Sequence, residues 1–263
     1  MRQDALGFTV ADLEAIDAEI DRRESEKARG NFLDFITYTK KDYTVNWHHR
    51  FIAKKIQDFV DNKIKNLMVF LPTQCGKSEQ AARRLPAYLL GLFPDKRVGI
   101  CSYSQRRAAA FGQDVQRIIT STEYQKVFPE TTVSRGLKTS LKNRNRYDCT
   151  KDKFEIVNHR GILFAVGTGG SLTGDSIDYL ILDDTVKDWK QALSPAYQEG
   201  NTGWWDSVAK TRLDNDGKVI IVNTRWVEED LSGYITASKE FDFEIIVFPV
   251  SYTHLTLPTI LLV

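Results

Sequence analysis

Residues 66–80, NLMVFLPTQCGKSEQ, decide the fold of this chain. After its first residue the run 66–71 is continuously apolar, and it ends at Pro72, as expected of a strand buried on both faces of a parallel sheet. Gly76, Lys77 and Ser78 come next, followed by a stretch with a helical pattern. A strand, a Gly-Lys-Ser turn and a helix in this order form the setting of a phosphate-binding loop (P-loop), in which backbone N–H groups and a helix N-terminus surround phosphate groups.

The loop departs in one place from the full P-loop pattern. Five residues before Gly76, where the pattern has glycine, stands Leu71. Taken alone, the turn is open to two interpretations: a nucleotide site, or an ordinary strand-to-helix turn in which Gly-Lys-Ser is incidental. In a nucleotide site, Lys77 reaches the β and γ phosphates and Ser78 binds magnesium. The predicted nucleotide-binding residues of the loop are Thr73, Gln74, Cys75, Gly76, Lys77 and Ser78.

Further apolar runs predict a sheet of several strands. Strand patterns begin at positions 97 (RVGICSYS), 154 (FEIV), 162 (ILFAV), 178 (DYLILDD), 218 (KVIIVNTRW) and 243 (FEIIVFP), and a long helical interval covers 187–211. Two strand-helix units follow each other directly, which is typical of a wound parallel sheet. We therefore expect an α/β fold, a P-loop NTPase of the additional-strand type, with a mainly parallel central sheet flanked by helices.

Two adjacent carboxylates end the apolar run DYLILDD. Asp183 and Asp184 would lie at the carboxyl edge of the sheet, where α/β proteins bind ligands. Alone, an Asp pair at this place is more often a turn or a helix cap. Together with the Gly-Lys-Ser loop it favours nucleotide hydrolysis, with Asp183 holding magnesium and Asp184 accepting a proton from the attacking water. A third strand end places Thr224 and Arg225 nearby, where a hydroxyl can sense the γ phosphate.

The region before the P-loop strand predicts helices. Helical spacing over 10–29 and the stop at Gly30 indicate an amphipathic helix, which we expect to pack on its own domain rather than on another subunit. A short apolar element follows at 31–39. The stretch WHHRFIAKKIQDFVDNKI predicts a helix with six residues directed inward: Trp47, Phe51, Ile52, Ile56, Phe59 and Val60.

Composition is that of an ordinary globular protein. Hydrophobic residues make up 42% of 263 and charged residues 27%, and no apolar run or export signal indicates a membrane span or secretion. Cys75, Cys101 and Cys149 do not form a disulfide or zinc pattern.

The charge of the chain is balanced overall but not locally. A net charge of +1 gives no overall positive field, but basic residues gather in one stretch. This stretch can be a surface that contacts phosphates, or a solvated loop rich in lysine and arginine. Its basic residues are Arg135, Lys138, Lys142, Arg144, Arg146, Lys151 and Lys153, opposed by Asp148 and Asp152.

Residues 31–250 resemble the ATPase region of phage terminase large subunits. The resemblance rests on ordered motifs: WHHRFIAKKI, VFLPTQCGKSE, GTGGSLTGDSIDYLILDD, VKDWKQALSP and IIVNTRWVEEDLSG. It implies a motor that hydrolyses ATP with Mg²⁺, forms a homo-oligomeric ring, and drives double-stranded DNA into a procapsid. The implied partners are DNA, the portal protein and the terminase small subunit, with no membrane involved, and the implied location is the host cytoplasm.

The resemblance also implies roles for particular residues. Lys77, Asp184 and Thr224 are the expected catalytic residues, Thr224 standing in the family's coupling motif. Ser78 and Asp183 are the expected magnesium ligands. The segment with Trp47, His48 and His49 resembles the motif on the adenine side of the nucleotide, and the glycine-rich loop 167–174 is either a moving element or a tight connection.

Two departures from the family pattern limit this transfer. Many relatives have arginine two residues before the P-loop glycine, where this chain has Gln74. A transition-state arginine must then come from elsewhere, in cis or from a neighbouring subunit, and the candidates are Arg106, Arg107, Arg160 and Arg225. The family's C-terminal nuclease domain is not expected in this chain: we assign 1–30 to an N-terminal helix, 31–250 to the ATPase domain, and 251–263 to a truncated or non-native tail.

Two other functions remain open from the sequence alone. The chain can be a different P-loop nucleic-acid translocase or helicase, because those proteins share the P-loop and the Asp pair. It can also be a module that binds a nucleotide or a portal without turnover.

Overall fold

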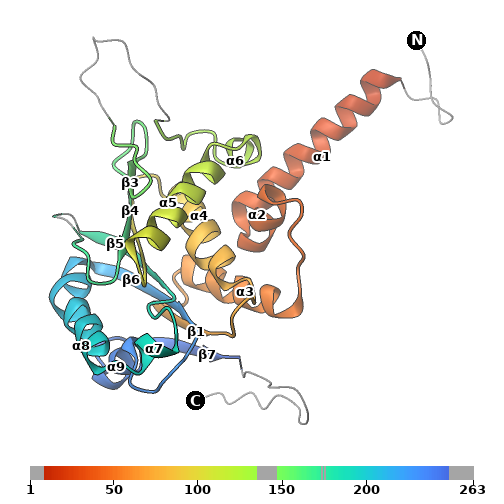
Figure 1. The fold of residues 1–263 in the computed structure, drawn as a ribbon. Helices are drawn as coiled ribbons and strands as arrows, with labels where there is room; N and C mark the ends of the chain where they lie inside the picture. The colour runs from red at the N-terminus through yellow and green to blue at the C-terminus, as the bar shows by residue number, and fades with distance from the viewer. Residues whose placement is uncertain (1–8, 135–146, 173, 175, 249–263) are drawn as a thin grey trace, which may run out of the picture.

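A seven-stranded sheet organises the part of the chain that the computed structural model describes, residues 9–134, 147–172, 174 and 176–248 (Figure 1). The strands lie in the order β3-β4-β2-β5-β6-β1-β7, all parallel except β3, which runs antiparallel to β4. Their bounds are β1 Asn66–Phe70, β2 Arg97–Ser102, β3 Lys153–Glu155, β4 Ile162–Gly167, β5 Ile177–Asp183, β6 Leu213–Asn223 and β7 Phe243–Val247. The predicted mainly parallel sheet is confirmed, and β6 is the additional strand between β1 and β5.

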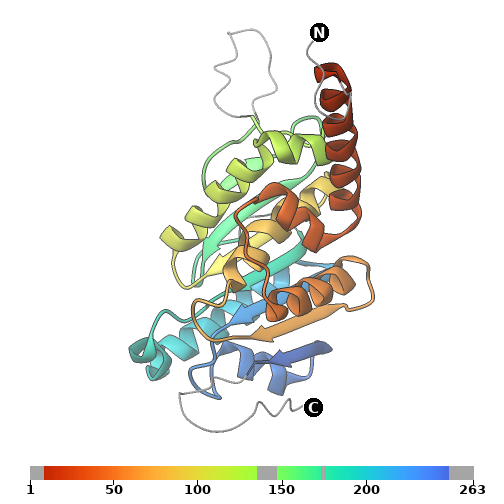
Figure 2. The ribbon, with the colours of Figure 1, turned by 90° about the vertical axis from the view of Figure 1, so that its right-hand side faces the viewer.

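Helices cover both faces of the sheet (Figures 1 and 2). One face carries α3 (Trp47–Val60), α4 (Leu85–Leu92) and α5 (Gln105–Ile119), with α2 (Phe32–Thr39) and α6 (Thr122–Val127) packed beside them. The other face carries α8 (Pro195–Trp204) and α9 (Leu231–Ser238). The shorter elements are η1 (Glu79–Arg84), α7 (Trp189–Ala192), η2 (Trp205–Ala209) and η3 (Lys210–Arg212).

The alternation of side chains along β1 divides the core in two. Leu67 and Val69 join the cluster under α3, α4 and α5, whereas Met68 and Phe70 join the cluster under α8 and α9. Successive side chains of a strand point to opposite faces, so both faces of β1 are covered with apolar residues. This explains why the sequence of this strand is apolar without interruption.

The prediction for α3 was wrong at two positions. Ile52, Ile56 and Phe59 are buried, as expected, but Trp47 is 70% exposed and Phe51 is 42% exposed. The inward face of a helix is set by residues three and four apart, and the stripe of buried residues does not include the first helical residue or position 51. Trp47 and Phe51 instead contact the ring of Phe248, which follows the edge strand β7.

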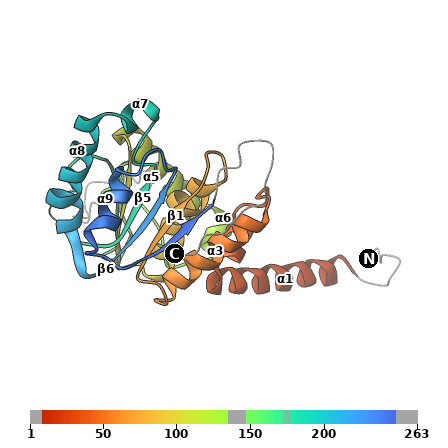
Figure 3. The same ribbon diagram turned by 90° about the horizontal axis from the view of Figure 1, so that it is seen from below.

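The N-terminal helix α1 (Val10–Gly30) confirms the predicted helix and projects from the domain (Figures 1 and 3). Its last turns pack on α2 and α6: Ala28 is buried, and Asp21 accepts from the Tyr38 hydroxyl and pairs with Lys126. The apolar residues Val10, Leu13, Ile16 and Ile20 are exposed. The expectation that this helix packs on its own domain is therefore confirmed for its last turns and wrong for the half that carries these apolar residues.

Candidate active site

The register of the sheet brings the three predicted strand ends to one place. Phe70 of β1 lies opposite Asn223 of β6, and Val222 lies opposite Asp183 of β5. Parallel strands end at the same edge, so the loops after β1, β5 and β6 meet there. The residues that follow these strands are the P-loop, Asp184 and Thr224, as the sequence predicted.

The P-loop has the backbone conformation of an anion-binding turn. Gln74 and Gly76 have positive φ angles, 63° and 72°. The backbone N–H groups of residues 75–78 have no backbone acceptor within the described part of the chain. Free N–H groups in a turn that leads into a helix create a concave site for an anion.

Asp183 and Ser78 form the candidate metal centre. The Ser78 hydroxyl donates to Asp183 Oδ2 at 2.8 Å, and Asp183 is fully buried. Its second oxygen, Oδ1, has no hydrogen-bond partner among the described residues. Burial, followed by the charge of Asp184, raises the pKa of Asp183 to about 7. A buried carboxylate with an unpartnered oxygen beside a hydroxyl fits Mg²⁺, which prefers hard oxygen ligands and removes the penalty of a buried charge.

Lys77, Asp184 and Thr224 form a connected group next to that centre. Lys77 Nζ lies 3.1 Å from Asp184 Oδ2 and also donates to Thr224 Oγ1. The Thr224 N–H donates to Asp184 Oδ1 at 3.0 Å. Asp184 has a φ of 44°, and its carbonyl accepts from the N–H of Tyr103 at 3.0 Å. Asp184 is therefore held from three strand ends: its carboxylate by Lys77 after β1 and Thr224 after β6, and its carbonyl by Tyr103 after β2.

The predicted adenine-side segment with Trp47, His48 and His49 lies at the start of α3, and His49 reaches the P-loop from there. His49 Nε2 lies 3.3 Å from the carbonyl oxygen of Cys75. The His48 ring packs on the His49 ring at 4.0 Å, and Trp47 packs on His48 and Phe248. Thr73 and Cys75 lie in the loop with Gln74 and Gly76, where the Cys75 thiol faces the Thr73 carbonyl at 3.7 Å.

The four candidates for the transition-state arginine differ in their distance from the P-loop edge of the sheet. Arg160 precedes β4 and its backbone N–H donates to Asp95, which places it at the amino edge of the sheet, away from the P-loop. Arg225 pairs with Asp230 at 3.2 Å and donates to two carbonyls of its own loop. Arg106 and Arg107 begin α5 at the carboxyl edge of β2, and the charge of Arg107 acts on Asp183.

Asn223 was missed by the sequence analysis. Its amide oxygen accepts from the Thr185 N–H at 3.3 Å, and its amide nitrogen donates to the hydroxyls of Thr185 at 3.2 Å and Ser232 at 2.9 Å. The Thr185 carbonyl in turn accepts from Tyr197 of α8. The only signal in the sequence was an Asn at the end of an apolar run, which is common at strand ends.

Three other predicted features lie partly or wholly outside the described residues. Two hydrogen bonds involve the described part of the glycine-rich loop: Gly167 N–H donates to Gln105, and the Gly170 carbonyl accepts from Trp204. Residues 135–146 of the basic stretch and the tail 251–263 lie outside the described residues. Lys153 pairs with Asp148 at 3.0 Å.

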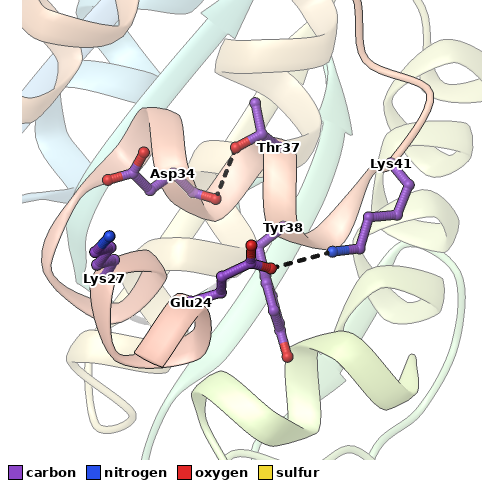
Figure 4. Close-up of a pocket in the computed structure, with 6 residues that line it drawn as sticks. All are labelled: Glu24, Lys27, Asp34, Thr37, Tyr38 and Lys41. Carbon is purple, nitrogen blue, oxygen red and sulfur yellow. Dashed lines mark hydrogen bonds and ion pairs between the residues drawn. The ribbon is translucent and has the colours of Figure 1, made fainter. Parts of the chain in front are cut away.

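A separate hollow of about 320 Å³ lies between α1 and α2 (Figure 4). Its lining combines acidic and basic side chains, and Lys41 pairs with Glu24 across it at 3.8 Å. Because its charges offset each other and it lies apart from the P-loop, it does not share the chemistry of the site described above.

The fold and the site together define a class of protein. A parallel sheet with an additional strand between the P-loop strand and the acidic strand, and Lys77, Ser78 and the Asp pair at its carboxyl edge, is the architecture of a P-loop NTPase. Residues 68–257 match the family described as terminase large subunit, T4likevirus-type, N-terminal. The chain belongs to this family.

Solved structures similar to this chain include large terminases. A mutant of the large terminase ATPase domain of Thermus phage P74-26 is 20% identical, with 69% of this chain and 65% of that chain covered and a TM-score of 0.40. Another structure of that domain is 20% identical, with 61% of this chain and 59% of that chain covered and a TM-score of 0.38. The large terminase of bacteriophage HK97 is 14% identical, with 75% of this chain and 38% of that chain covered and a TM-score of 0.46. The chain thus spans less than two thirds of each of these relatives.

A search of curated proteins gives no match. Among the described residues, no helix is both long enough and apolar enough to cross a membrane.

Proposed function

We propose that this chain is the ATP-hydrolysing motor part of a terminase large subunit, which uses the energy of ATP to move double-stranded DNA into a procapsid. The observation that carries the proposal is the pair of contacts at the carboxyl edge: Ser78 to the buried Asp183, and Lys77 to Asp184. Family membership supplies the packaging context. DNA, a portal protein, a small subunit and further copies of this chain in a ring are the proposed partners, in the host cytoplasm.

The proposed mechanism assigns one task to each side chain. The P-loop N–H groups and Lys77 bind the phosphates and neutralise their charge. Ser78 and Asp183 would hold Mg²⁺, which would supply a Lewis acid to stabilise charge on the phosphate oxygens. Asp184 orients the attacking water and accepts its proton. Thr224 contacts both Lys77 and Asp184, so a change in their positions when the γ phosphate is lost would be transmitted to β6.

Magnesium-dependent release of phosphate from ATP tests the proposal. The full chain is assayed alone and with linear double-stranded DNA, beside Lys77→Met, which keeps the length of the side chain but removes its charge. We expect hydrolysis by the wild-type chain and at least about 100-fold less by Lys77→Met, because a lost charge on the phosphates removes transition-state stabilisation.

The result also separates the alternatives. ATP binding with no difference in turnover between wild type and Lys77→Met contradicts the motor and leaves a binding module. Separation of DNA strands during hydrolysis favours a helicase over a packaging motor.

A further inference from the structure

The side chain of His49 lies between α3 and the P-loop. It is 8% exposed, and its ring packs on Tyr43 at 5.3 Å. A Cβ atom placed on Gly76 would lie 2.7 Å from His49 Nε2. The P-loop therefore lies so close to the imidazole ring that only glycine fits at position 76 without a shift of the ring or the loop.

The surroundings of the ring determine which nitrogen carries the proton. The Asn46 N–H donates to His49 Nδ1 at 3.1 Å, so Nδ1 is an acceptor. In a neutral imidazole the other nitrogen is then the donor. Nε2 faces the Cys75 carbonyl oxygen at 3.3 Å, so the ring carries a hydrogen bond from the start of α3 into the P-loop.

This contact fixes the orientation of one peptide plane. No cis peptide bond occurs among the described residues, and in a trans peptide the C=O and N–H groups point in opposite directions. Holding the Cys75 carbonyl toward His49 therefore directs the N–H of Gly76 away from α3. That N–H belongs to the turn with free amides that the phosphates require.

The backbone of His49 is held as firmly as its ring. The buried Gln80 donates from its amide nitrogen to the His49 carbonyl and to the Tyr43 hydroxyl, both at 3.0 Å. Gln80 belongs to η1, the segment that follows the P-loop. His49 is thus tied to both sides of the loop, through Cys75 before the Gly-Lys-Ser turn and through Gln80 after it.

We propose that His49 is a positioning residue that sets the Cys75–Gly76 peptide for phosphate binding. The inference rests on the proposed ATP site. It gives the buried histidine of the WHH motif a role at the phosphates, whereas the resemblance placed this segment on the adenine side.

Two substitutions separate the two nitrogens of the ring. In His49→Gln the side-chain amide reaches the place of Nε2 and can donate to the Cys75 carbonyl; in His49→Asn it reaches only the place of Nδ1 and can accept from Asn46. Binding of Mg·ATP to the full chain is measured by calorimetry, together with KM, kcat and thermal melting without nucleotide.

We expect His49→Asn to weaken Mg·ATP binding about tenfold, and His49→Gln to stay within about threefold of wild type, since one hydrogen bond to a buried carbonyl is at stake. Equal losses in both variants, in step with their melting temperatures, would show a merely structural role and overturn the inference. Unchanged binding in His49→Asn would overturn it as well.

A second variant covers the case in which His49→Asn does not fold. In His49→Ala, added imidazole restores Mg·ATP affinity if the ring positions the loop, and failure of this rescue contradicts the inference. If the wild-type chain does not bind Mg·ATP, the proposed function fails together with this role. If the wild-type chain binds Mg·ATP but the His49 variants do not show the expected changes in affinity, the positioning role of His49 is wrong and the proposed function still stands.

Discussion

Asp184 occupies a strained backbone position that its task explains. Its φ of 44° lies in the left-handed region, which a non-glycine residue adopts at a cost of about 1 kcal/mol or more. The surrounding contacts enforce that geometry: Lys77 and the Thr224 N–H hold the two carboxylate oxygens, and Tyr103 holds the carbonyl. The carboxylate is thereby presented at the sheet edge beside the Asp183 centre.

At this residue, Asp184→Asn tests the assignment of the general base. Asparagine preserves the size of the side chain and can still accept from the Thr224 N–H, but it cannot take a proton from water. We expect kcat for ATP hydrolysis to fall by about 100-fold or more, with the Kd of Mg·ATP changed by less than about fivefold. Steady-state phosphate release and calorimetry measure the two values, and a variant that retains its turnover refutes the role of Asp184.

At the scale of elements, a buried polar network links the strand ends to the helices of one face. Asn223 ends β6 and bonds to Thr185, which follows Asp184, and to Ser232 of α9; Thr185 bonds to Tyr197 of α8. These groups are buried or partly buried and have their partners within the described chain, which makes such a network rigid. The loop that follows Asp184, the proposed general base, is therefore connected by hydrogen bonds to α8 and α9.

Asn223→Ala removes the centre of that network. It leaves the Thr185 N–H and two hydroxyls without their partner, so we expect the free energy of unfolding to drop by about 2 kcal/mol. We also expect kcat to fall more than the affinity for ATP, since Asp184 is adjacent. Asn215→Ala, on the exposed beginning of the same strand, is the matched control and should change neither value. Urea unfolding and ATPase kinetics provide the measurements.

The middle of β6 carries a buried lysine. Lys218 is 6% exposed; it donates to the Phe59 carbonyl at the end of α3 and to Asn62 at 3.0 Å, and burial lowers its pKa to about 8. The folded protein thus releases this proton at a lower pH than the unfolded chain does. Between about pH 8 and pH 10.5 the unfolded state binds more protons at this position, so the contribution of Lys218 to stability rises with pH.

Lys218→Met makes this pH dependence measurable. From about pH 7 to about pH 9.5, the stability of wild type relative to Lys218→Met should rise by about 1 to 2 kcal/mol. Lys54→Met, the same change at an exposed position of α3, should show no such trend. Urea unfolding of the three proteins at both pH values gives the comparison, and a difference that is constant with pH contradicts the assignment.

For the whole molecule, the site joins parts of the chain that are far apart in sequence. The P-loop, the Asp pair and Thr224 follow β1, β5 and β6, and these strands carry the two cores on the two faces of the sheet. A ligand that bridges these loops binds only the folded state, and so stabilises the entire domain. The projecting half of α1 lies outside this coupling, because its apolar residues contact neither core (Figure 3).

Mg·ATP should therefore raise the melting temperature of the chain. At a free concentration about 100 times its Kd, the ligand adds about 2.7 kcal/mol, which corresponds to a shift of about 5 to 10 °C for a domain of this size. Lys77→Met should lose most of this shift. Differential scanning calorimetry with and without Mg·ATP measures it, and an equal shift in both proteins places the nucleotide elsewhere.

The local pattern alone determined the α/β class and the approximate position of each strand, and it selected five candidate residues that the structure brings together: Lys77, Ser78, Asp183, Asp184 and Thr224. This was possible because strand periodicity, the Gly-Lys-Ser turn and the Asp pair are properties of neighbouring residues. The exposure of Trp47, the hydrogen bond from His49 to Cys75, the network around Asn223 and the distance of Arg160 from the P-loop edge of its own chain required the tertiary structure. Each depends on which segments lie side by side, and that is decided by strand order and packing across the sheet, over separations that no sequence window spans.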